Sequence, residues 1–484
     1  MPRAIVFRRL LVPLATVLVL TSASAMAEAR PASGPRGPRP VPTHAAPWTA
    51  VTGMAAPRTA VTRAALTRTA VIPAAAPRSA VTRAALTRTA VPRTAATRSG
   101  AWAGTWTGTW EAAASGTAPA LPGATVRNVV HTSVGGPAAR VRLSNRLGTT
   151  PLRLGSVTLA LQRPGEPDSP RAVAGSVRAL TFAGAASVTV PAGRDLVSDP
   201  VALSVPADAN LLVSVHTPAD SGPATYHRSA LQPGFVAPAG DRTAEESGAG
   251  YTVTVGSWYY VTGVDVLGTA AAAGSVVALG DSITDGTGSS PGANHRWPDF
   301  LAARLRGLPP HRRPGVLNAG ISGNRLLLDG VGPSAPTRLD ADVFSRAGVR
   351  TLIVLEGIND IKGTPEQSDP RALEDAYRLV VRRAHAHGIR VVGGTITPYG
   401  GHAAYTPARE AVRQAVNAAI RTHRIFDAVA DLDAAVRDPA HPDRILPAYD
   451  PGDHLHFDDA GMRALAAAID LRSLLTPPAA GHRP

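Results

Sequence analysis

A serine follows a short apolar run in residues 275–286, SVVALGDSITDG. Val276–Leu279 is too short for a helix, is rich in valine and is flanked by Gly274 and Gly280, so the pattern predicts a buried strand that ends just before Ser282. Open α/β sheets bind their ligands at the carboxyl ends of strands. Because a serine hydroxyl is a poor nucleophile until a base takes its proton, Ser282 needs a histidine that is itself held by an acceptor.

Two histidines with carboxylates close by lie in residues 449–460, YDPGDHLHFDDA. Asp453 and His456 are spaced as D-x-x-H, and a turn can fold that carboxylate back onto its imidazole. His454 is a competing base, because residues two apart in an extended segment share a face. The residues alone therefore predict a Ser–His–Asp arrangement without choosing between the two histidines.

Acyl transfer also needs hydrogen-bond donors aimed at the oxyanion that forms during attack. Two further apolar runs end in suitable groups. Residues 316–324, VLNAGISGN, contain Gly320, and residues 352–360, LIVLEGIND, contain Gly357 and Asn359. A backbone N–H and a side-chain amide are the donors that such a site requires.

These stretches resemble, in order, the four sequence blocks of the SGNH (GDSL) hydrolases: Gly280-Asp281-Ser282, Gly320 within NAGISG, Gly357-Ile358-Asn359-Asp360, and Asp453 to His456. Four blocks in order are a strong signal, whereas one alone is weak. The resemblance implies a flavodoxin-like parallel sheet with Ser282 as nucleophile, His456 as base and Asp453 as the residue that orients the base. It also implies an oxyanion hole made by the N–H groups of Ser282 and Gly320 and the side-chain amide of Asn359.

A narrower likeness to the arylesterase and acetylxylan-esterase branch lies in RWPDFL (296–301), NAGISGNRLL (318–327) and LEGINDI (355–361). The α/β-hydrolase elbow G-x-S-x-G is absent, because Thr284 stands where its second glycine would be.

Each of these residues also has a plainer interpretation. Ser282 on its own is compatible with a helix cap. Four acids between residues 450 and 459 suggest a calcium site, and they are Asp450, Asp453, Asp458 and Asp459. They lack the EF-hand spacing, so we expect no metal. We expect no cofactor either. Asp285 and Asp360 are expected to hold loops.

The composition of the 484 residues allows two or three domains. Cysteine is absent, which excludes disulfides, thiolate zinc sites and cysteine nucleophiles. The formal net charge is +14, yet residues 1–100 contain fourteen arginines and one acid, Glu28, so they carry +13 of it. A nucleic-acid footprint would be confined to this segment, and we expect no nucleic-acid partner.

The first residues are typical of a secretory signal peptide, residues 1–27. Arg3, Arg8 and Arg9 precede the apolar run Leu10–Leu20, and small residues follow at 23–27. That run is too short to span a bilayer, and no later stretch is long enough. We therefore expect a secreted protein without a membrane span, and the export route stays open.

Residues 28–98 are dominated by Ala, Arg, Pro and Thr, and AVTRAALTRTAV occurs at Ala60–Val71 and again at Ala80–Val91. Two copies are too few for a solenoid, and their small side chains cannot bury enough surface to offset chain entropy. The segment is predicted to be a disordered linker. A functional alternative gives it affinity for the cell wall or for acidic polymers through its arginines.

Residues 101–268 contain short runs rich in Val, Leu and Thr, separated by Gly, Pro and Asp, which predict an antiparallel β-sandwich. The expected strands are Val126–Val130, Ala139–Leu143, Ser156–Leu161, Ser187–Val190, Val201–Val205, Leu211–Val215 and Tyr251–Val255. Trp102, Trp106 and Trp110 suit either stacking on sugar rings or sealing of the core, and burial is the commoner fate of tryptophan.

From residue 275 to 475 strand-like and helix-like segments alternate, which predicts an α/β domain with a parallel sheet covered on both faces. The expected strands are 276–280, 314–318, 350–356 and 389–395. The expected helices are 296–306, 338–347, 371–388, 408–423 and 459–471.

Together these features predict a secreted serine esterase that cleaves carboxylic esters through an acyl-enzyme. The resemblance favours short acyl groups, such as acetyl, on carbohydrate or aryl esters. One alternative is a lipase or phospholipase acting on lipid esters. Another is a polysaccharide-binding cell-wall protein whose esterase activity is auxiliary.

Overall fold

A computed structural model describes residues 104–268, 273–422 and 424–476. All of them belong to one compact unit, Pro92–Pro484. The predicted signal peptide, the predicted linker and Trp102 lie outside the described residues. No helix in the described part of the chain is long and apolar enough to cross a membrane.

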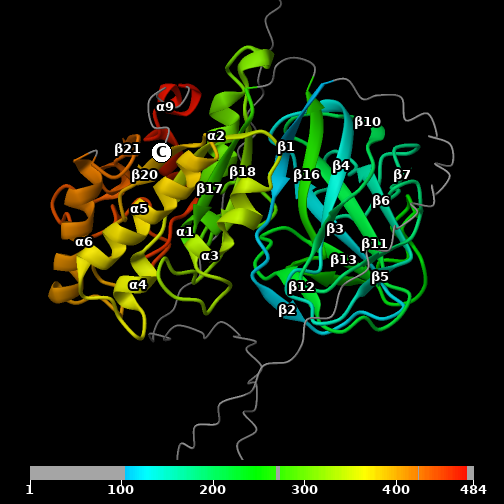
Figure 1. Cartoon of the computed structure of the whole chain (residues 1–484), viewed down its shortest axis with the longest axis horizontal. Coiled ribbons are helices and arrows are strands. Elements are labelled where there is room, and N and C mark those ends of the chain that lie inside the picture. Colours follow the sequence, from blue (N-terminus) through cyan, green and yellow to red (C-terminus); the bar gives the residue numbers. More distant parts are fainter. Residues whose placement is uncertain (1–103, 269–272, 423, 477–484) are drawn as a thin grey trace, which may run out of the picture. The chain divides into compact units, whose positions relative to one another are not determined.

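Antiparallel strands form the first half of the described chain (Figure 1). Their bounds are β1 (Thr105–Glu111), β2 (Gly116–Ala118), β3 (Thr125–His131), β4 (Gly136–Ser144), β5 (Leu152–Leu154), β6 (Ser156–Leu161), β7 (Arg178–Ala179), β8 (Val188–Val190), β9 (Asp195–Val197), β10 (Val201–Val205), β11 (Asn210–His216), β12 (Ala224–His227), β13 (Gly234–Ala237), β14 (Val253–Val255), β15 (Trp258–Tyr259) and β16 (Val261–Gly268).

Two large sheets of these strands make the expected β-sandwich. One has the order β1-β16-β4-β10, with β9 also paired to β4, and the other has the order β14-β13-β3-β11-β6-β7. Alternate residues of both sheets meet in one buried cluster, as Val141 of β4 and Val213 of β11 do. The core therefore lies between the sheets.

The two tryptophans of β1 differ in burial. Trp110 is 7% exposed and packs edge-on against Trp258, with ring centroids 5.0 Å apart. The guanidinium of Arg140 lies 4.6 Å from the centre of the Trp106 ring. Trp110 is thus buried in the sandwich core, whereas the half-buried Trp106 ring is packed against Arg140.

The second half of the described chain is built on a parallel sheet with the order β18-β17-β19-β20-β21. The bounds are β17 (Ser275–Gly280), β18 (Gly315–Gly320), β19 (Val349–Leu355), β20 (Arg390–Gly394) and β21 (Ala428–Ala430). In chain order this is 2-1-3-4-5, the flavodoxin-like arrangement that was expected. The sequence did not predict β21, because three residues of Ala and Val carry too little pattern to mark a strand.

Helices cover both faces of this sheet: α1 (Ser282–Asp285), α2 (Trp297–Leu305), α3 (Ala335–Leu339), α4 (Ile358–Lys362), α5 (Pro370–Ala386), α6 (Pro407–Arg421), α7 (Leu432–Val436), α8 (Asp459–Ala467) and α9 (Leu471–Leu475), with a 3₁₀ turn η1 (Pro310–Arg312) and a π-helical turn η2 (Asp340–Phe344).

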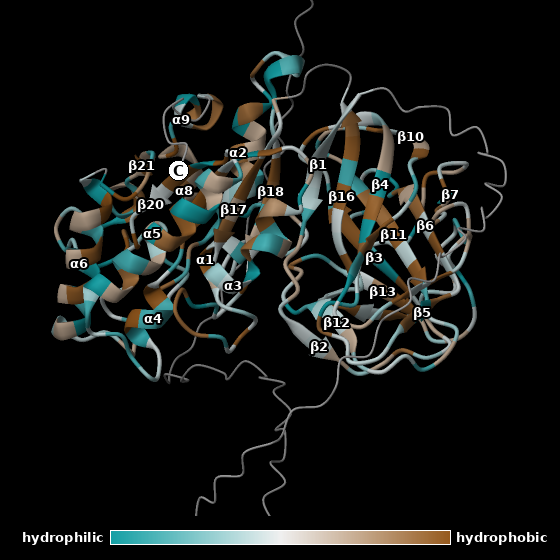
Figure 2. Cartoon of the chain, viewed as in Figure 1, coloured by the Kyte–Doolittle hydropathy of each residue, from teal (hydrophilic) through white to brown (hydrophobic). Residues whose placement is uncertain are grey.

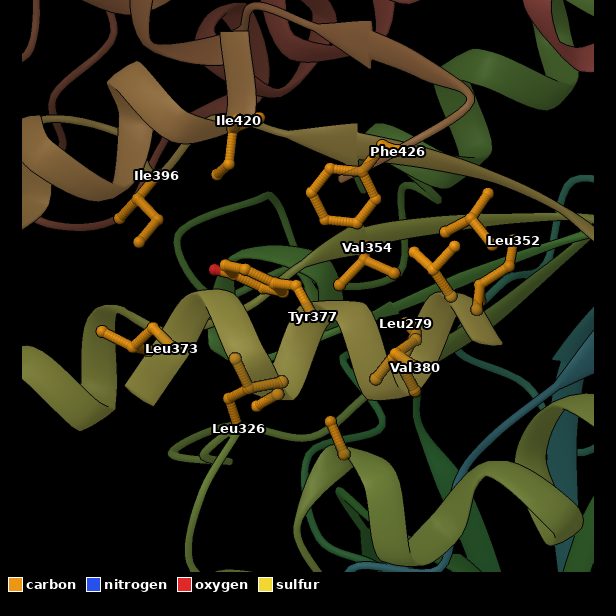
Figure 3. Packing of buried hydrophobic residues seen from close by; sticks show 14 of the residues in the cluster. Leu279, Leu326, Leu352, Val354, Leu373, Tyr377, Val380, Ile396, Ile420 and Phe426 are labelled. Carbon is orange, nitrogen blue, oxygen red and sulfur yellow. The ribbon is translucent and has the colours of Figure 1, made fainter. Parts of the chain in front are cut away.

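Alternation along the strands divides the core of this half in two. Val277 and Leu279 of β17 pack toward α3, α5 and α6, whereas Val276 and Ala278 pack toward α2, α7, α8 and α9. Figure 3 shows Tyr377 and Val380 of α5 facing the strand residues Val354 and Leu279. In Figure 2 apolar colour runs along β17 and β18, while α5 and α6 alternate between apolar and polar colour, as helices with one buried face do.

Two predicted helices are corrected. The helix expected at 338–347 begins earlier, because Pro336 suits a first helical turn, and it continues as a π-helical turn to Phe344. The helix expected at 459–471 ends at Ala467, and α9 begins separately because the Asp470 side chain accepts the N–H of Arg472 and caps it.

The sandwich closes the outer edge of β18. The Ser133 hydroxyl accepts the N–H of Val316 at 2.9 Å. The backbones approach so closely that a Cβ on Gly315 would lie 1.9 Å from the Gly108 carbonyl oxygen. An exposed strand edge invites pairing with other chains, and here the protein's own β1 region covers it.

A buried contact between an arginine and a glutamate reinforces this junction. Arg346 lies 2.7 Å from Glu111 of β1, and both side chains are at most 3% exposed. Burial raises the pKa of Glu111 to about 8, although the Arg346 charge opposes the rise. The sandwich and the parallel-sheet half thus share a polar network as well as a covered edge.

Candidate active site

Ser282 is the first residue of α1, directly after β17. The Asp281 carboxylate accepts the N–H of Ile283 at 2.9 Å and so caps the helix in its place. Gly280 has no room for a side chain, because a Cβ would lie 2.3 Å from both the Leu355 carbonyl and the Thr284 hydroxyl. The tight turn therefore holds Ser282 at the carboxyl end of β17, where the strand order reverses, and leaves the residue 8% exposed.

The structure brings Ser282, His456 and Asp453 together in one hydrogen-bonded chain. His456 Nε2 lies 2.8 Å from Ser282 Oγ, and His456 Nδ1 lies 2.6 Å from Asp453 Oδ2. Because a carboxylate at Nδ1 accepts that proton, the unprotonated Nε2 is the atom that faces the serine.

Asp453 is itself held by the turn that carries it. Its Oδ1 accepts the N–H of Leu455 at 3.0 Å and the N–H of His456 at 2.9 Å. Partial burial would raise the pKa of the Asp453 carboxyl, but these N–H groups and the His456 ring together hold it below its usual value. The carboxyl is therefore ionised wherever the imidazole beside it is able to act as a base.

His454, the competing histidine, pairs elsewhere. Its Nδ1 lies 2.5 Å from Asp450 Oδ2, and its side chain is 47% exposed. The segment is not extended at this point, because His454 has a φ of 61°, so it does not share a face with His456. The geometry thus makes the choice that residue spacing left open.

Gly320, predicted to donate to the oxyanion, does not have a free donor. Its N–H is donated to the Asn318 side-chain oxygen at 2.9 Å. A Cβ on Gly320 would lie 2.2 Å from the backbone nitrogen of Asp285, so the glycine is needed for the close approach of α1. The prediction for Gly320 is corrected: it is a packing residue.

Gly323, three residues later, has the donor. Its N–H meets no acceptor in the described part of the chain. The N–H of Ser322 before it is bound by Asp285 of α1 at 2.9 Å, and the carbonyl of Asn324 after it accepts from the Asn359 amide at 2.9 Å. Gly323 therefore lies between the helix that carries Ser282 and the amide of Asn359. The Ser-Gly turn signal in NAGISGN would have pointed to it.

Asn359 and the N–H of Ser282 complete the set of donors. Asn359 lies in α4 and is 7% exposed. An amide has two N–H groups, and only one of them is used by Asn324. Ser282 opens its helix, so its N–H has no intrahelical acceptor. The N–H groups of Ser282 and Gly323 and the second amide hydrogen of Asn359 are thus available together.

The two acids expected to hold loops do so. Asp360 accepts the N–H groups of Leu326 and Leu327 at 2.7 and 2.9 Å. Asp285 accepts both the N–H and the hydroxyl of Ser322. Together they fix both ends of the turn that contains Gly323.

The sequence did not predict two polar residues that stand near the His456–Asp453 pair. Lys362 lies one turn after Asn359 in α4 and on the same face. Burial lowers the pKa of Lys362, and the nearby Asp281 charge opposes that change. His402 accepts the N–H of Ala404 at Nδ1, so its neutral ring carries the proton at Nε2. Burial and the Lys362 charge lower the pKa of His402.

The four acids once weighed as a calcium site each have another partner. Asp450 and Asp453 bind histidines, Asp458 caps α8, and Asp459 lies 2.7 Å from His295. No group of three or more metal-ligating side chains gathers anywhere in the described ranges.

Comparison with known proteins supports a family assignment. Residues 278–464 match the model of the GDSL-like Lipase/Acylhydrolase family. A comparison with curated proteins gives no match.

Several solved structures are similar to about two fifths of this chain. They include Est24, a carbohydrate acetylesterase from Sinorhizobium meliloti (19% identity, 40% of this chain and 95% of that chain, TM-score 0.32), the M. smegmatis aryl esterase (18%, 41% and 98%, 0.33) and the acetyl xylan esterase AlAXEase (20%, 40% and 96%, 0.31).

Proposed function

We propose that this chain is a serine esterase with Ser282 as its nucleophile, and the match of residues 278–464 to the model of the GDSL-like Lipase/Acylhydrolase family supports this. The observation that carries the proposal is the unbroken chain from Asp453 through His456 to Ser282, with contacts of 2.6 and 2.8 Å. These distances are those that a nucleophile and its base require.

In the first half of the reaction, His456 Nε2 takes the hydroxyl proton while Ser282 Oγ attacks the ester carbonyl. Asp453, ionised at neutral pH, keeps the proton on Nδ1 and stabilises the imidazolium that forms. The negative oxygen of the tetrahedral intermediate accepts from the Ser282 and Gly323 N–H groups and from the Asn359 amide. His456 then protonates the leaving alcohol.

In the second half, water replaces the alcohol. His456 takes a proton from that water, the resulting hydroxide attacks the acyl-enzyme, and the same donors hold the second oxyanion. Collapse of this intermediate returns the proton to Ser282 and releases the carboxylic acid. Each group in the cycle belongs to the chain itself.

We place the substrate among esters with a short acyl group, such as acetyl, on carbohydrate or on an aryl alcohol. The narrower sequence likeness supports this choice, and so does the surface. Among the described residues, the exposed large apolar side chains are Val253, Leu328 and Leu379, and only Leu328 follows the Gly323 turn. A lipase would need a broad apolar surface to meet lipid.

Residues 1–27 have the pattern of an export signal, so we also propose that the esterase acts outside the cell. N-terminal sequencing of protein recovered from culture medium tests this, with a new terminus after Ala25 or Ala27 as the expected result. Intact residues 1–27 on intracellular protein would contradict it.

The test of activity compares the purified protein with Ser282→Ala on nitrophenyl esters of increasing acyl length and on acetylated xylan. We expect serine-dependent hydrolysis that falls with acyl length, together with acetate release from xylan. A rate that rises toward long acyl chains, with no acetate from xylan, would favour the lipase or phospholipase alternative. Binding to xylan that Ser282→Ala retains, with weak turnover in the unchanged protein, would favour a polysaccharide-binding protein with auxiliary esterase activity.

A further inference from the structure

A histidine of the β-sandwich reaches the helix that carries Ser282. His227, the last residue of β12, is 3% exposed, and its Nε2 lies 3.0 Å from Asp285 Oδ1. Its Nδ1 lies 2.8 Å from the carbonyl oxygen of Ala113. A carbonyl oxygen only accepts, so Nδ1 carries a proton, and an ionised Asp285 calls for a second proton on Nε2.

The pair is an ion pair sealed between the two halves. Burial alone would lower the pKa of His227, but the charge and hydrogen bond of Asp285 raise it above its usual value. Burial alone would raise the pKa of Asp285, but His227 lowers it. Buried charges persist when they are paired and hydrogen-bonded, and both conditions hold here.

The other oxygen of Asp285 holds the turn beside the active site. Asp285 Oδ2 accepts the Ser322 N–H at 2.9 Å and the Ser322 hydroxyl at 2.5 Å. Ser322 directly precedes Gly323, whose N–H is the unbound donor. Asp285 itself is three residues after Ser282 in α1, so one carboxylate links the nucleophile's helix, the donor turn and the sandwich.

Neighbouring contacts fix the orientation of the histidine. The His227 ring packs on Trp258, with centroids 5.3 Å apart. Arg296 donates from Nε to the Asp285 carbonyl at 3.1 Å and also bonds the Ala230 carbonyl of the sandwich half. His227 therefore has one defined orientation, and its hydrogen bond and charge fix the position of the Asp285 carboxylate.

We propose that His227 is a positioning residue of the esterase: through Asp285 and Ser322 it holds the Gly323 N–H in the oxyanion hole, so the β-sandwich supplies part of the active-site framework. This inference rests on the proposed function. It assigns to the sandwich a role in turnover that does not depend on binding a polymer. Because the Gly323 N–H is needed chiefly when the oxyanion forms, loss of His227 must lower kcat more than it raises KM.

The primary test replaces His227 by Gln, which keeps a donor but loses the charge and the second fixed contact. The expected result with nitrophenyl acetate is a fall in kcat of about tenfold to a hundredfold, since a small misplacement of a catalytic group has effects of that size. KM should stay within about twofold. The matched control is Ser133→Ala, which removes a sandwich contact to Val316 near the start of β18, seven residues before Gly323; it should turn over normally.

A double-variant comparison distinguishes an effect of His227 through Asp285 from a general loss of structure at the junction. If His227 acts through Asp285, then His227→Gln should cost nothing further in an Asp285→Asn background, because the link is already broken. Should the His227 variants fail to fold, Ser322→Ala tests the same path from the other side. It removes the hydroxyl contacts with Asp285 and with the Thr287 hydroxyl but keeps the Ser322 N–H bond to Asp285, and we expect kcat to fall by about threefold to tenfold.

The outcomes are distinct. Activity retained by Ser282→Ala contradicts the proposed function itself. Activity lost in Ser282→Ala but unchanged in His227→Gln overturns only the inference about the sandwich. Equal losses in His227→Gln and Ser133→Ala, or independent losses in the double variant, would also overturn it, because the junction as a whole would then be responsible.

Discussion

The Nε2 atom of His456 lies 2.8 Å from the Oγ atom of Ser282, although 174 positions separate the two residues in the chain. The serine is fixed by the turn after β17, and the histidine by the turn that Asp453 closes. Each turn is local and is specified by its own few residues. The contact between them depends on the tertiary fold, which brings the turn before α8 to the carboxyl end of β17.

The two adjacent Asp–His pairs allow a matched comparison. Asp453→Asn should lower kcat by roughly a thousandfold to ten-thousandfold, because an amide no longer fixes the His456 tautomer or stabilises its charged form. Asp450→Asn makes the same change in the pair with His454, which does not face Ser282, and should leave kcat near its starting value. Steady-state kinetics on nitrophenyl acetate measure both. Similar losses in the two variants would refute the assignment of His456 as the base.

Asn359→Ala should lower kcat by about a hundredfold to a thousandfold, since it removes one oxyanion donor. The buried amide also donates to the Asn324 carbonyl, so thermal unfolding should show a modest loss of stability as well. Asn324→Ala is a useful control, because it alters the side chain while keeping the backbone carbonyl that accepts from Asn359. Unchanged turnover in Asn359→Ala would exclude the amide from the oxyanion hole.

The glycines of the NAGISG block should respond differently to alanine. In Gly320→Ala the new methyl group meets the α1 backbone, so we expect a loss of several kcal/mol in the free energy of unfolding and little folded protein. Gly323 has a φ of 84°, and a Cβ added to it would meet only the Val331 side chain, at 3.3 Å. Gly323→Ala should fold, with a penalty of about 1–2 kcal/mol, and should lose most of its turnover. Denaturant titration and kinetics together check the pair, and a stable, inactive Gly320→Ala would restore the original prediction.

The raised pKa of Asp281 predicts that the stability of the protein depends on pH. Burial raises its pKa to about 7 in the folded protein, well above the ordinary value for a carboxyl. The folded state therefore binds this proton more tightly than the unfolded state, so stability is full below about pH 4 and falls as the pH rises toward 7. Asp281→Asn keeps an oxygen for the helix cap and removes the titration. Its unfolding free energy relative to the unchanged protein should thus rise by up to about 4 kcal/mol between pH 4 and 7.

Asp450→Asn is the control for this measurement, because its effect on stability should change with pH in the opposite direction. The pKa of Asp450 is lowered, because the Gly452 N–H and the His454 contacts outweigh its partial burial. Asp450→Asn should therefore cost stability at neutral pH, and that cost should shrink as the pH falls through the lowered pKa. Denaturant unfolding at several pH values follows both variants. A stability difference for Asp281→Asn that is constant with pH would show that this carboxyl does not titrate in this range.

Much of the site was predictable because its parts are local. Ser282 follows a valine-rich strand, and Asp453 and His456 lie within one turn, so short motifs identify them. The motif does not show which glycine of the NAGISG block donates to the oxyanion, because both Gly320 and Gly323 lie in it. Only the structure reveals that the Gly320 N–H is already bound.

The pairing of His227 with Asp285 was beyond the sequence for a different reason. The two residues are 58 positions apart, in halves of unlike fold, and no spacing or periodicity connects them. The strand β21 escaped because three small residues become a strand only when β20 is present to pair with them. Both depend on tertiary contacts, which a local pattern does not contain.

The contact between Gly108 and Gly315 bears on how this enzyme is engineered. Excision of residues 104–268 would uncover the outer edge of β18 and remove the His227 partner of Asp285. Such a truncated protein would present a bare strand to its neighbours and should self-associate on refolding. Exchange of the whole sandwich for another domain meets the same obstacle. The replacement would need a glycine in the place of Gly108, against Gly315, and a cation in the place of His227, beside the buried Asp285 carboxylate.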